Sequence, residues 1–175
     1  MKKLFLIILI LGYVKVFSQS CNEITKSFDK FTEVTTFSSP QINVGKSKLK
    51  DVKTVSITIH KKVSKLDTLY FLDFMGLTSK LGISSRGIII LMNEGNKIDE
   101  KDLIFELIEH SSLADIYYAK LPLTDKRLGL LKNHKITDIR LFAYNSHSPD
   151  DFVDISDEIS SQIVFYLECL IKSVF

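Results

Sequence analysis

A strict alternation of apolar and polar residues in the first half of the chain constrains its fold most. Val55, Ile57 and Ile59 alternate with polar residues over residues 54–60, which is the period-two pattern of a strand with one buried face. A second run, residues 69–75, follows after a short segment rich in lysine, so the two runs predict a hairpin. Strands connected by turns this short pair antiparallel.

Further strands follow from the same kind of pattern. Residues 87–92 are apolar on both sides, which suits an inner strand. The segment Asn-Glu-Gly-Asn after it predicts a tight turn in which Gly95 takes a positive φ. Other strands are expected at residues 34–42, 103–108, 116–123 and 136–144.

Two helices are expected near the C-terminus. Thr124 is a suitable N-cap for a short helix over residues 125–133. A longer helix over about residues 156–174 carries apolar residues at spacings of three and four, with Asp157 and Glu158 in its first turn. The sequence therefore predicts an α+β fold, with a mostly antiparallel sheet of about 6–8 strands, a short helix, and a long amphipathic C-terminal helix packed on one face.

The first twenty residues predict export. Two lysines precede an uninterrupted apolar run over residues 4–14, and small or polar residues follow, as in a secretory signal peptide. The run is shorter than the about 20 apolar residues that cross a membrane. Small residues allow cleavage after Ser18 or after Ser20, and both stay open. We expect residues 1–20 to be a signal peptide and residues 21–175 to be a single domain with no membrane span.

Charge is unevenly distributed along the expected mature chain. Without the three lysines of the signal peptide, 20 Lys and Arg remain against 21 Asp and Glu, so the formal charge falls from +2 to −1. A basic patch remains, which predicts contact with an anionic envelope component, although such clusters are also ordinary solvated surface. Nucleic acid is not an expected partner outside the cytoplasm. The patch consists of Lys46, Lys48, Lys50, Lys53, Lys61, Lys62 and Lys65.

The two cysteines, Cys21 and Cys169, stand at opposite ends of the expected mature chain. Because exported proteins fold in an oxidising compartment, an even count predicts a disulfide. The alternative is lipid attachment to Cys21. It ranks second because Ser18 stands where such cleavage sites usually carry an apolar residue. The expected location is periplasmic or secreted, alternatively that of an outer-membrane lipoprotein.

No cofactor, metal or catalytic residue is predicted. The stretch PQINVGKS ends like a phosphate-binding loop, but Pro40 stands where that motif needs glycine. The four histidines share no metal-ligand spacing. The best remaining cluster is His147 with Asp150 and Asp151, a weak site candidate that an ordinary solvated turn explains better.

Several motifs together resemble small exported proteins of unknown function from Bacteroidota. They are a signal peptide followed by Cys21, the segments SFDKFT at residues 27–32 and KNHKITDIRL at residues 132–141, a strand reaching Ser39-Pro40, and a closing helix with ECLI at residues 168–171. The resemblance implies an envelope or secreted location and a domain of sheet and helix. It implies no activity.

These observations favour a non-catalytic binding or structural protein of the cell envelope, rather than an enzyme. The alternatives are a small extracytoplasmic hydrolase with an unrecognised site around His147, Asp150 and Asp151, or a lipoprotein anchored through Cys21.

Overall fold

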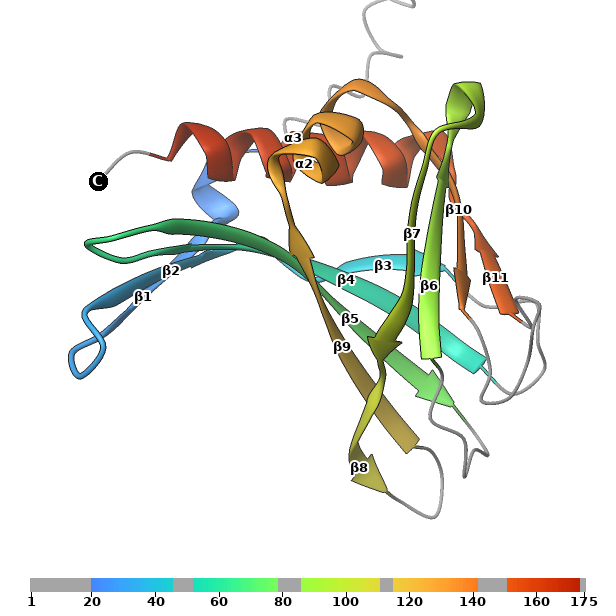
Figure 1. Ribbon diagram of the computed structural model, residues 1–175, viewed down its shortest axis with the longest axis horizontal. Helices are drawn as coiled ribbons and strands as arrows, with labels where there is room; N and C mark the ends of the chain where they lie inside the picture. Colours follow the sequence, from blue (N-terminus) through green and yellow to red (C-terminus); the bar gives the residue numbers. More distant parts are fainter. Residues whose placement is uncertain (1–19, 46–51, 79–85, 111–114, 142–150, 174–175) are drawn as a thin grey trace, which may run out of the picture.

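The computed structural model describes residues 20–45, 52–78, 86–110, 115–141 and 151–173. Its strands form two antiparallel sheets, and the α-helices lie over the opening between them (Figure 1). The larger sheet has the order β1-β2-β4-β5-β9-β8, and β3 pairs beside β2 on the same edge of β4. Its strands are β1 (Thr25–Asp29), β2 (Val34–Ser38), β3 (Ile42–Gly45), β4 (Val52–Val63), β5 (Thr68–Thr78), β8 (Glu106–His110) and β9 (Asp115–Leu123).

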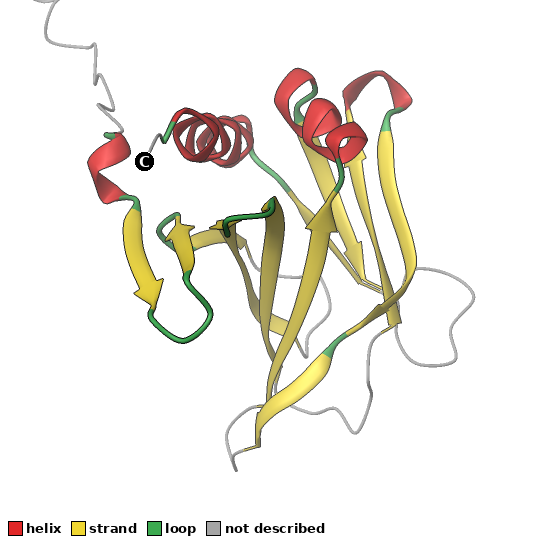
Figure 2. Ribbon diagram, turned by 60° about the vertical axis from the view of Figure 1, so that its left-hand side comes forward, coloured by secondary structure: helices red, strands yellow, loops and turns green. Residues whose placement is uncertain are grey.

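The smaller sheet has the order β11-β10-β6-β7. The chain passes from β7 into β8 through the buried Phe105, so one extended segment contributes to both sheets. On the opposite side β3 contacts β11. The two sheets therefore splay apart around one interior, as Figure 2 shows from the side. The strands of the smaller sheet are β6 (Arg86–Met92), β7 (Lys97–Ile104), β10 (Ile136–Leu141) and β11 (Asp151–Asp154).

Side-chain caps define where the two α-helices begin. Thr124 accepts a hydrogen bond from the Arg127 N–H, and Ser156 accepts one from the Ile159 N–H. Each cap satisfies one of the backbone donors that a helix start leaves open. The α-helices are α2 (Asp125–Asn133) and α3 (Asp157–Lys172), and two short 3₁₀ turns are η1 (Cys21–Glu23) and η2 (Asn93–Gly95).

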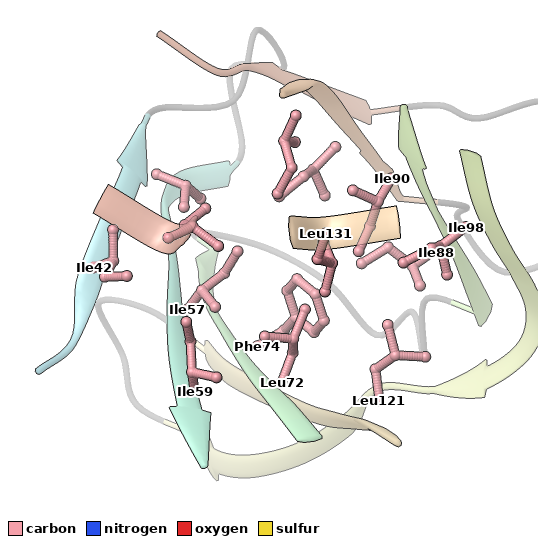
Figure 3. Packing of buried hydrophobic residues seen from close by; sticks show 14 of the residues in the cluster. Ile42, Ile57, Ile59, Leu72, Phe74, Ile88, Ile90, Ile98, Leu121 and Leu131 are labelled. Atoms are coloured by element: carbon pink, nitrogen blue, oxygen red, sulfur yellow. The ribbon is translucent and has the colours of Figure 1, made fainter. Parts of the chain in front are cut away.

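The core lies between the two sheets and beneath α3. Ile163, Leu167 and Leu170 on α3 are fully buried, and the helix contacts β3 and β4 of one sheet and β10 of the other. Figure 3 shows the labelled side chains of both sheets meeting Leu131 of α2 in one apolar cluster. This packing explains the apolar spacing of the C-terminal helix, because both sheets need cover on their inner faces.

The predicted fold class is wrong. It had a single sheet of about 6–8 strands with a long C-terminal helix on one face, whereas the described residues form eleven strands in two sheets. The C-terminal helix has 16 residues, shorter than expected, and it contacts both sheets. Alternation along a strand reports that one face is buried but not which sheet the strand joins, and that is why the prediction failed.

The expected strand over residues 34–42 is two strands. Pro40 lacks an N–H for the ladder, and the chain breaks there between β2 and β3. Ser39 bridges the break, because its backbone N–H donates to Ile59 O over 2.9 Å and its Oγ accepts from Ile59 N–H over 2.9 Å. The strands β1 and β11 had no clear alternation and were not predicted.

Other local predictions are confirmed. The hairpin of β4 and β5 pairs from Val52↔Thr78 to Val63↔Thr68, and β6 is an inner strand between β10 and β7. Gly95 has a φ of 75° in the turn after β6. Within the described residues, no helix combines the length and the apolar character needed to cross a membrane.

Candidate functional site

The structure links the two cysteines. Cys21 in η1 and Cys169 in α3 form a disulfide, with their Cα atoms 5.5 Å apart. The Tyr166 hydroxyl, one turn earlier on α3, donates a hydrogen bond to the Glu23 carboxylate. Both contacts hold the N-terminal segment against the last helix, so the predicted pairing of the cysteines is confirmed.

The weak site candidate lies largely outside the described residues. His147 and Asp150 fall in the undescribed segment 142–150, and Asp151 opens β11 without a described side chain. The structure therefore says nothing about whether these three residues meet. Among the described residues, no group of three or more His, Cys, Asp and Glu side chains is placed to hold a metal ion.

The structure separates the lysines of the predicted basic patch. Lys46, Lys48 and Lys50 lie outside the described residues, and the side chain of Lys53 is not described. Lys61 and Lys62 are neighbours on β4, so their side chains point to opposite faces of the sheet. The remaining member, Lys65, lies in the turn after β4 and is exposed.

Lys61 serves the core. Its side chain is buried on the inner face, where Nζ donates to the Ser173 carbonyl at the end of α3 over 2.7 Å and lies near the rings of Phe37 and Tyr70. Burial lowers the pKa of the Lys61 ammonium. A cation at a helix C-terminus satisfies a carbonyl that the helix leaves open and complements its dipole.

A polar row crosses the outer face of the larger sheet. Ser38 on β2 stands opposite His60 on β4 in the strand register, and Ser38 Oγ lies 2.7 Å from His60 Nδ1. His60 Nε2 lies 3.1 Å from Asp73 Oδ2 on β5. In the neutral ring, Nε2 carries the proton and donates to Asp73, which leaves Nδ1 to accept from the Ser38 hydroxyl. Sequence reasoning missed this Ser38–His60–Asp73 row.

Tyr118 on β9 extends the row. Burial raises the pKa of the Tyr118 phenol, and hydrogen bonding to the Asp73 carboxylate and its charge act in the same direction. The second carboxylate oxygen of Asp73, Oδ1, is buried and has no hydrogen-bond partner among the described residues. Four polar side chains from four neighbouring strands therefore lie in a line.

The aromatic ring beside the row is covered by protein. Phe71 is only 6% exposed, although it points to the outer face. The His60 ring stacks on it with centroids 5.0 Å apart, and the ammonium groups of Lys62 and Lys120 lie 5.4 and 4.5 Å from its centroid. Because these side chains occupy the ring, Phe71 offers no free face for stacking a ligand.

Two hollows open on other parts of the described surface. One, of about 280 Å³, adjoins the end of the polar row but shares only Tyr118 with it. The other, of about 390 Å³, lies between α2 and α3. There His134 already contacts Asn96, and Lys135 pairs with Asp157 over 3.1 Å. Neither hollow contains Ser38 or His60.

The turns at one end of the larger sheet form a third feature, which we call the hairpin end. It comprises the turn between β1 and β2, the turn between β4 and β5, and the strand ends that flank both turns. Thr35 pairs with Val63 where these turns leave the sheet, and Lys65 forms an ion pair with Glu33 across them. The two turns are therefore neighbours. Four large apolar side chains are exposed here: Phe28, Phe31, Leu66 and Leu69.

Cations surround these apolar side chains. Lys26, Lys30 and Lys62 form no ion pair within the described residues, and the Lys26 ammonium lies 5.5 Å from the Phe37 ring centroid. The hairpin end thus combines exposed apolar surface with free positive charge. In the sequence, SFDKFTE gave no sign of this, because only the strand register brings it beside residues 60–69.

Comparisons with protein-family models, curated proteins and solved structures each gave no match for this chain. The resemblance to small exported proteins from Bacteroidota therefore stays a prediction.

Proposed function

We propose that this protein is an exported, non-catalytic binding protein of the cell envelope that contacts an anionic partner through the lysines of the hairpin end. The observation that carries the proposal is the set Lys26, Lys30 and Lys62, which is exposed or half-buried and unpaired within the described residues. Such cations attract an anionic surface and lose little by leaving water only in part.

The disulfide supports the extracytoplasmic part of the proposal. Disulfides persist in oxidising compartments and are rare in the cytosol. The bond also argues against the lipoprotein alternative, because Cys21 Sγ cannot carry a lipid while it is bonded to Cys169.

Charge neutralisation tests the proposed contact. We expect a Lys26→Gln, Lys30→Gln, Lys62→Gln triple variant to lose most of its retention on anionic envelope fractions, with the loss largest at low salt. The matched control neutralises three exposed lysines elsewhere: Lys101, Lys126 and Lys132. Equal retention of both triple variants and the unmodified protein would refute the proposal.

One observation favours a second function, that of a serine hydrolase. The contacts of Ser38 with His60 and of His60 with Asp73 have the order of a nucleophile, a base and an orienting carboxylate. The surroundings argue against it. Ser38 lies inside β2 between two paired strands, where ladder bonds take up backbone groups that an oxyanion hole needs free. No hollow described above opens onto its hydroxyl.

A chromogenic ester assay separates the two functions. We expect hydrolysis of p-nitrophenyl acetate by the unmodified protein to equal that of a Ser38→Ala variant. Turnover that disappears in Ser38→Ala and in His60→Gln, while both variants remain folded, would replace the binding proposal with the hydrolase.

A further inference from the structure

The hairpin end exposes its apolar side chains to an unusual degree. Phe31 is 99% exposed and Leu66 97%, and Phe28 and Leu69 behind them are 58% and 57% exposed. Figure 1 shows both turns projecting from the same side of the molecule, beyond the area that α3 covers. Single exposed apolar residues are ordinary. Two at the tips of adjacent turns, each with a second one behind it, form a patch, and such patches mark contact sites.

The backbone of both tips is already satisfied within its own turn. Asp29 Oδ1 accepts from Phe31 N–H over 2.9 Å, and Ser64 Oγ accepts from Leu66 N–H over 3.2 Å and from Asp67 N–H over 3.0 Å. A backbone donor that has an internal partner loses less when water is removed. The tips can therefore enter a poorly hydrated environment without leaving these donors unpaired.

The carboxylates of the hairpin end are engaged, whereas three of its cations are free. Asp29 holds its own turn, and those hydrogen bonds lower its pKa. Glu33 pairs with Lys65, and Asp67 accepts from Thr68 N–H over 2.7 Å. Lys26, Lys30 and Lys62 have no such partner carboxylate in the described part of the chain. The charge that this end presents outward is therefore positive.

We infer that the hairpin end docks on an anionic phospholipid bilayer, with Phe31 and Leu66 entering the headgroup and acyl boundary and Lys26, Lys30 and Lys62 lying at the level of the phosphates. The inference rests on the proposed function, because it names the anionic partner as lipid. Apolar side chains below and cations above match the layering of such an interface.

The shape of the surface favours a bilayer over a protein partner. A stable protein interface needs about 800 Å² of complementary surface on each partner. The two tips are narrow turns whose side chains stand out singly, and a fluid interface accepts such projections without a matching pocket. Lys26 also lies on the exposed edge strand β1, and an edge lysine opposes strand pairing with a second copy.

The absence of tryptophan from the chain makes the inference directly measurable. Phe31→Trp and Leu66→Trp each place a single fluorophore at one tip, and Leu107→Trp places one at a half-exposed apolar position on the opposite sheet edge. We expect phosphatidylcholine vesicles that contain phosphatidylglycerol to shift the emission of both tip variants to the blue. The same vesicles should leave Leu107→Trp unchanged, and pure phosphatidylcholine should have a smaller effect on the tips.

Sedimentation with the same vesicles gives the second readout. We expect a Phe31→Ser, Leu66→Ser double variant to bind anionic vesicles at least about tenfold more weakly, while its retention on anionic polymer stays unchanged. The lysine triple variant should lose both. Because both tip positions are exposed, the double variant should remain folded, and circular dichroism checks this.

Other outcomes overturn the inference in distinguishable ways. Vesicle binding without a blue shift at either tip, or with a shift only in Leu107→Trp, would refute tip insertion. Retention on anionic polymer without any vesicle binding would refute the lipid partner and leave the proposed function standing. Loss of both would refute the two together. A blue shift that grows with protein concentration in the absence of vesicles would replace the bilayer by a second copy of the chain.

Discussion

The layer that contains η1 and α3 and the hairpin end use similar residues for opposite purposes. In the helix layer, Leu167 and Leu170 are fully buried, and the Cys21–Cys169 disulfide ties the layer together. At the hairpin end, Leu66 is 97% exposed, and short-range bonds hold each turn separately. The contacts of the first region explain why the domain is stable. The apolar residues of the second contribute almost nothing to folding, so a role in contact explains them better.

Loss of the disulfide should have the largest effect on this contrast. A disulfide across 148 residues contributes about 5 kcal/mol on the chain-entropy relation. We expect a Cys21→Ala, Cys169→Ala variant to lose stability of this order in urea unfolding at neutral pH. The unmodified protein with reductant should approach the same midpoint. An unchanged midpoint in both experiments would show that the helix layer does not depend on its covalent link.

A matched pair of leucines sharpens the comparison. Leu167→Ala should cost about 2–5 kcal/mol, because it removes a fully buried side chain and leaves a cavity. Leu66→Ala should stay within about 0.5 kcal/mol of the unmodified protein. Urea unfolding of both variants measures the difference. Similar costs at the two positions would mean that the hairpin end is packed in solution.

Two neighbouring lysines give the next largest contrast. Lys61→Ala removes the hydrogen bond to the Ser173 carbonyl and buried methylene groups, and we expect it to cost about 1.5–3 kcal/mol. Lys62→Ala should cost less than about 0.5 kcal/mol, because Lys62 lies on the outer face. Conversely, only Lys62→Ala should weaken retention on anionic fractions. The reverse assignment would contradict the separation of the two side chains.

Alkaline pH should reveal the smallest effect. Burial is the main cause that raises the pKa of Tyr118 and of Tyr166, and Asp73 and Glu23 add to it, respectively. The folded state therefore keeps these phenols protonated above pH 10, where the unfolded chain loses the protons. This stabilising contribution is complete below pH about 10 and is lost as pH rises through the folded pKa values.

Tyrosinate absorbance against pH, for the folded protein and for the protein in urea, checks this ordering. Burial lowers the pKa of Lys61, so that residue acts in the opposite direction, with stability rising as pH approaches its ordinary value of 10.5. Comparison with Tyr118→Phe isolates the tyrosine part, since one late-titrating phenol should disappear. Titration of all tyrosines near the ordinary value would contradict the buried position of Tyr118.

Local features of the fold could be predicted because their causes lie close together in the sequence. The helix over residues 125–133 follows from the cap Thr124, and the hairpin of β4 and β5 from alternation on both sides of a polar turn. The division into two sheets could not be predicted. It depends on the turn of the chain at Phe105, a buried residue that looks like any other apolar strand position.

The candidate surfaces depend on register between strands. Ser38, His60 and Asp73 lie on three different strands, and only the pairing of β2, β4 and β5 brings them together. Asp73 is flanked by apolar residues, and alternation places it on the outer face, but no local signal names its partner. The basic patch was grouped along the chain, which combined the inward Lys61 with the outward Lys62 and omitted Lys26 and Lys30.

The most direct test of a disulfide-linked, exported domain is the intact mass of the protein recovered from its native cells, before and after reduction and alkylation. We predict a mass that corresponds to cleavage after Ser18 or Ser20, with two alkylated thiols appearing only after reduction. A mass raised by a diacylglycerol on Cys21, with Cys169 alkylated without reductant, would contradict the account, and so would a chain that retains residues 1–20.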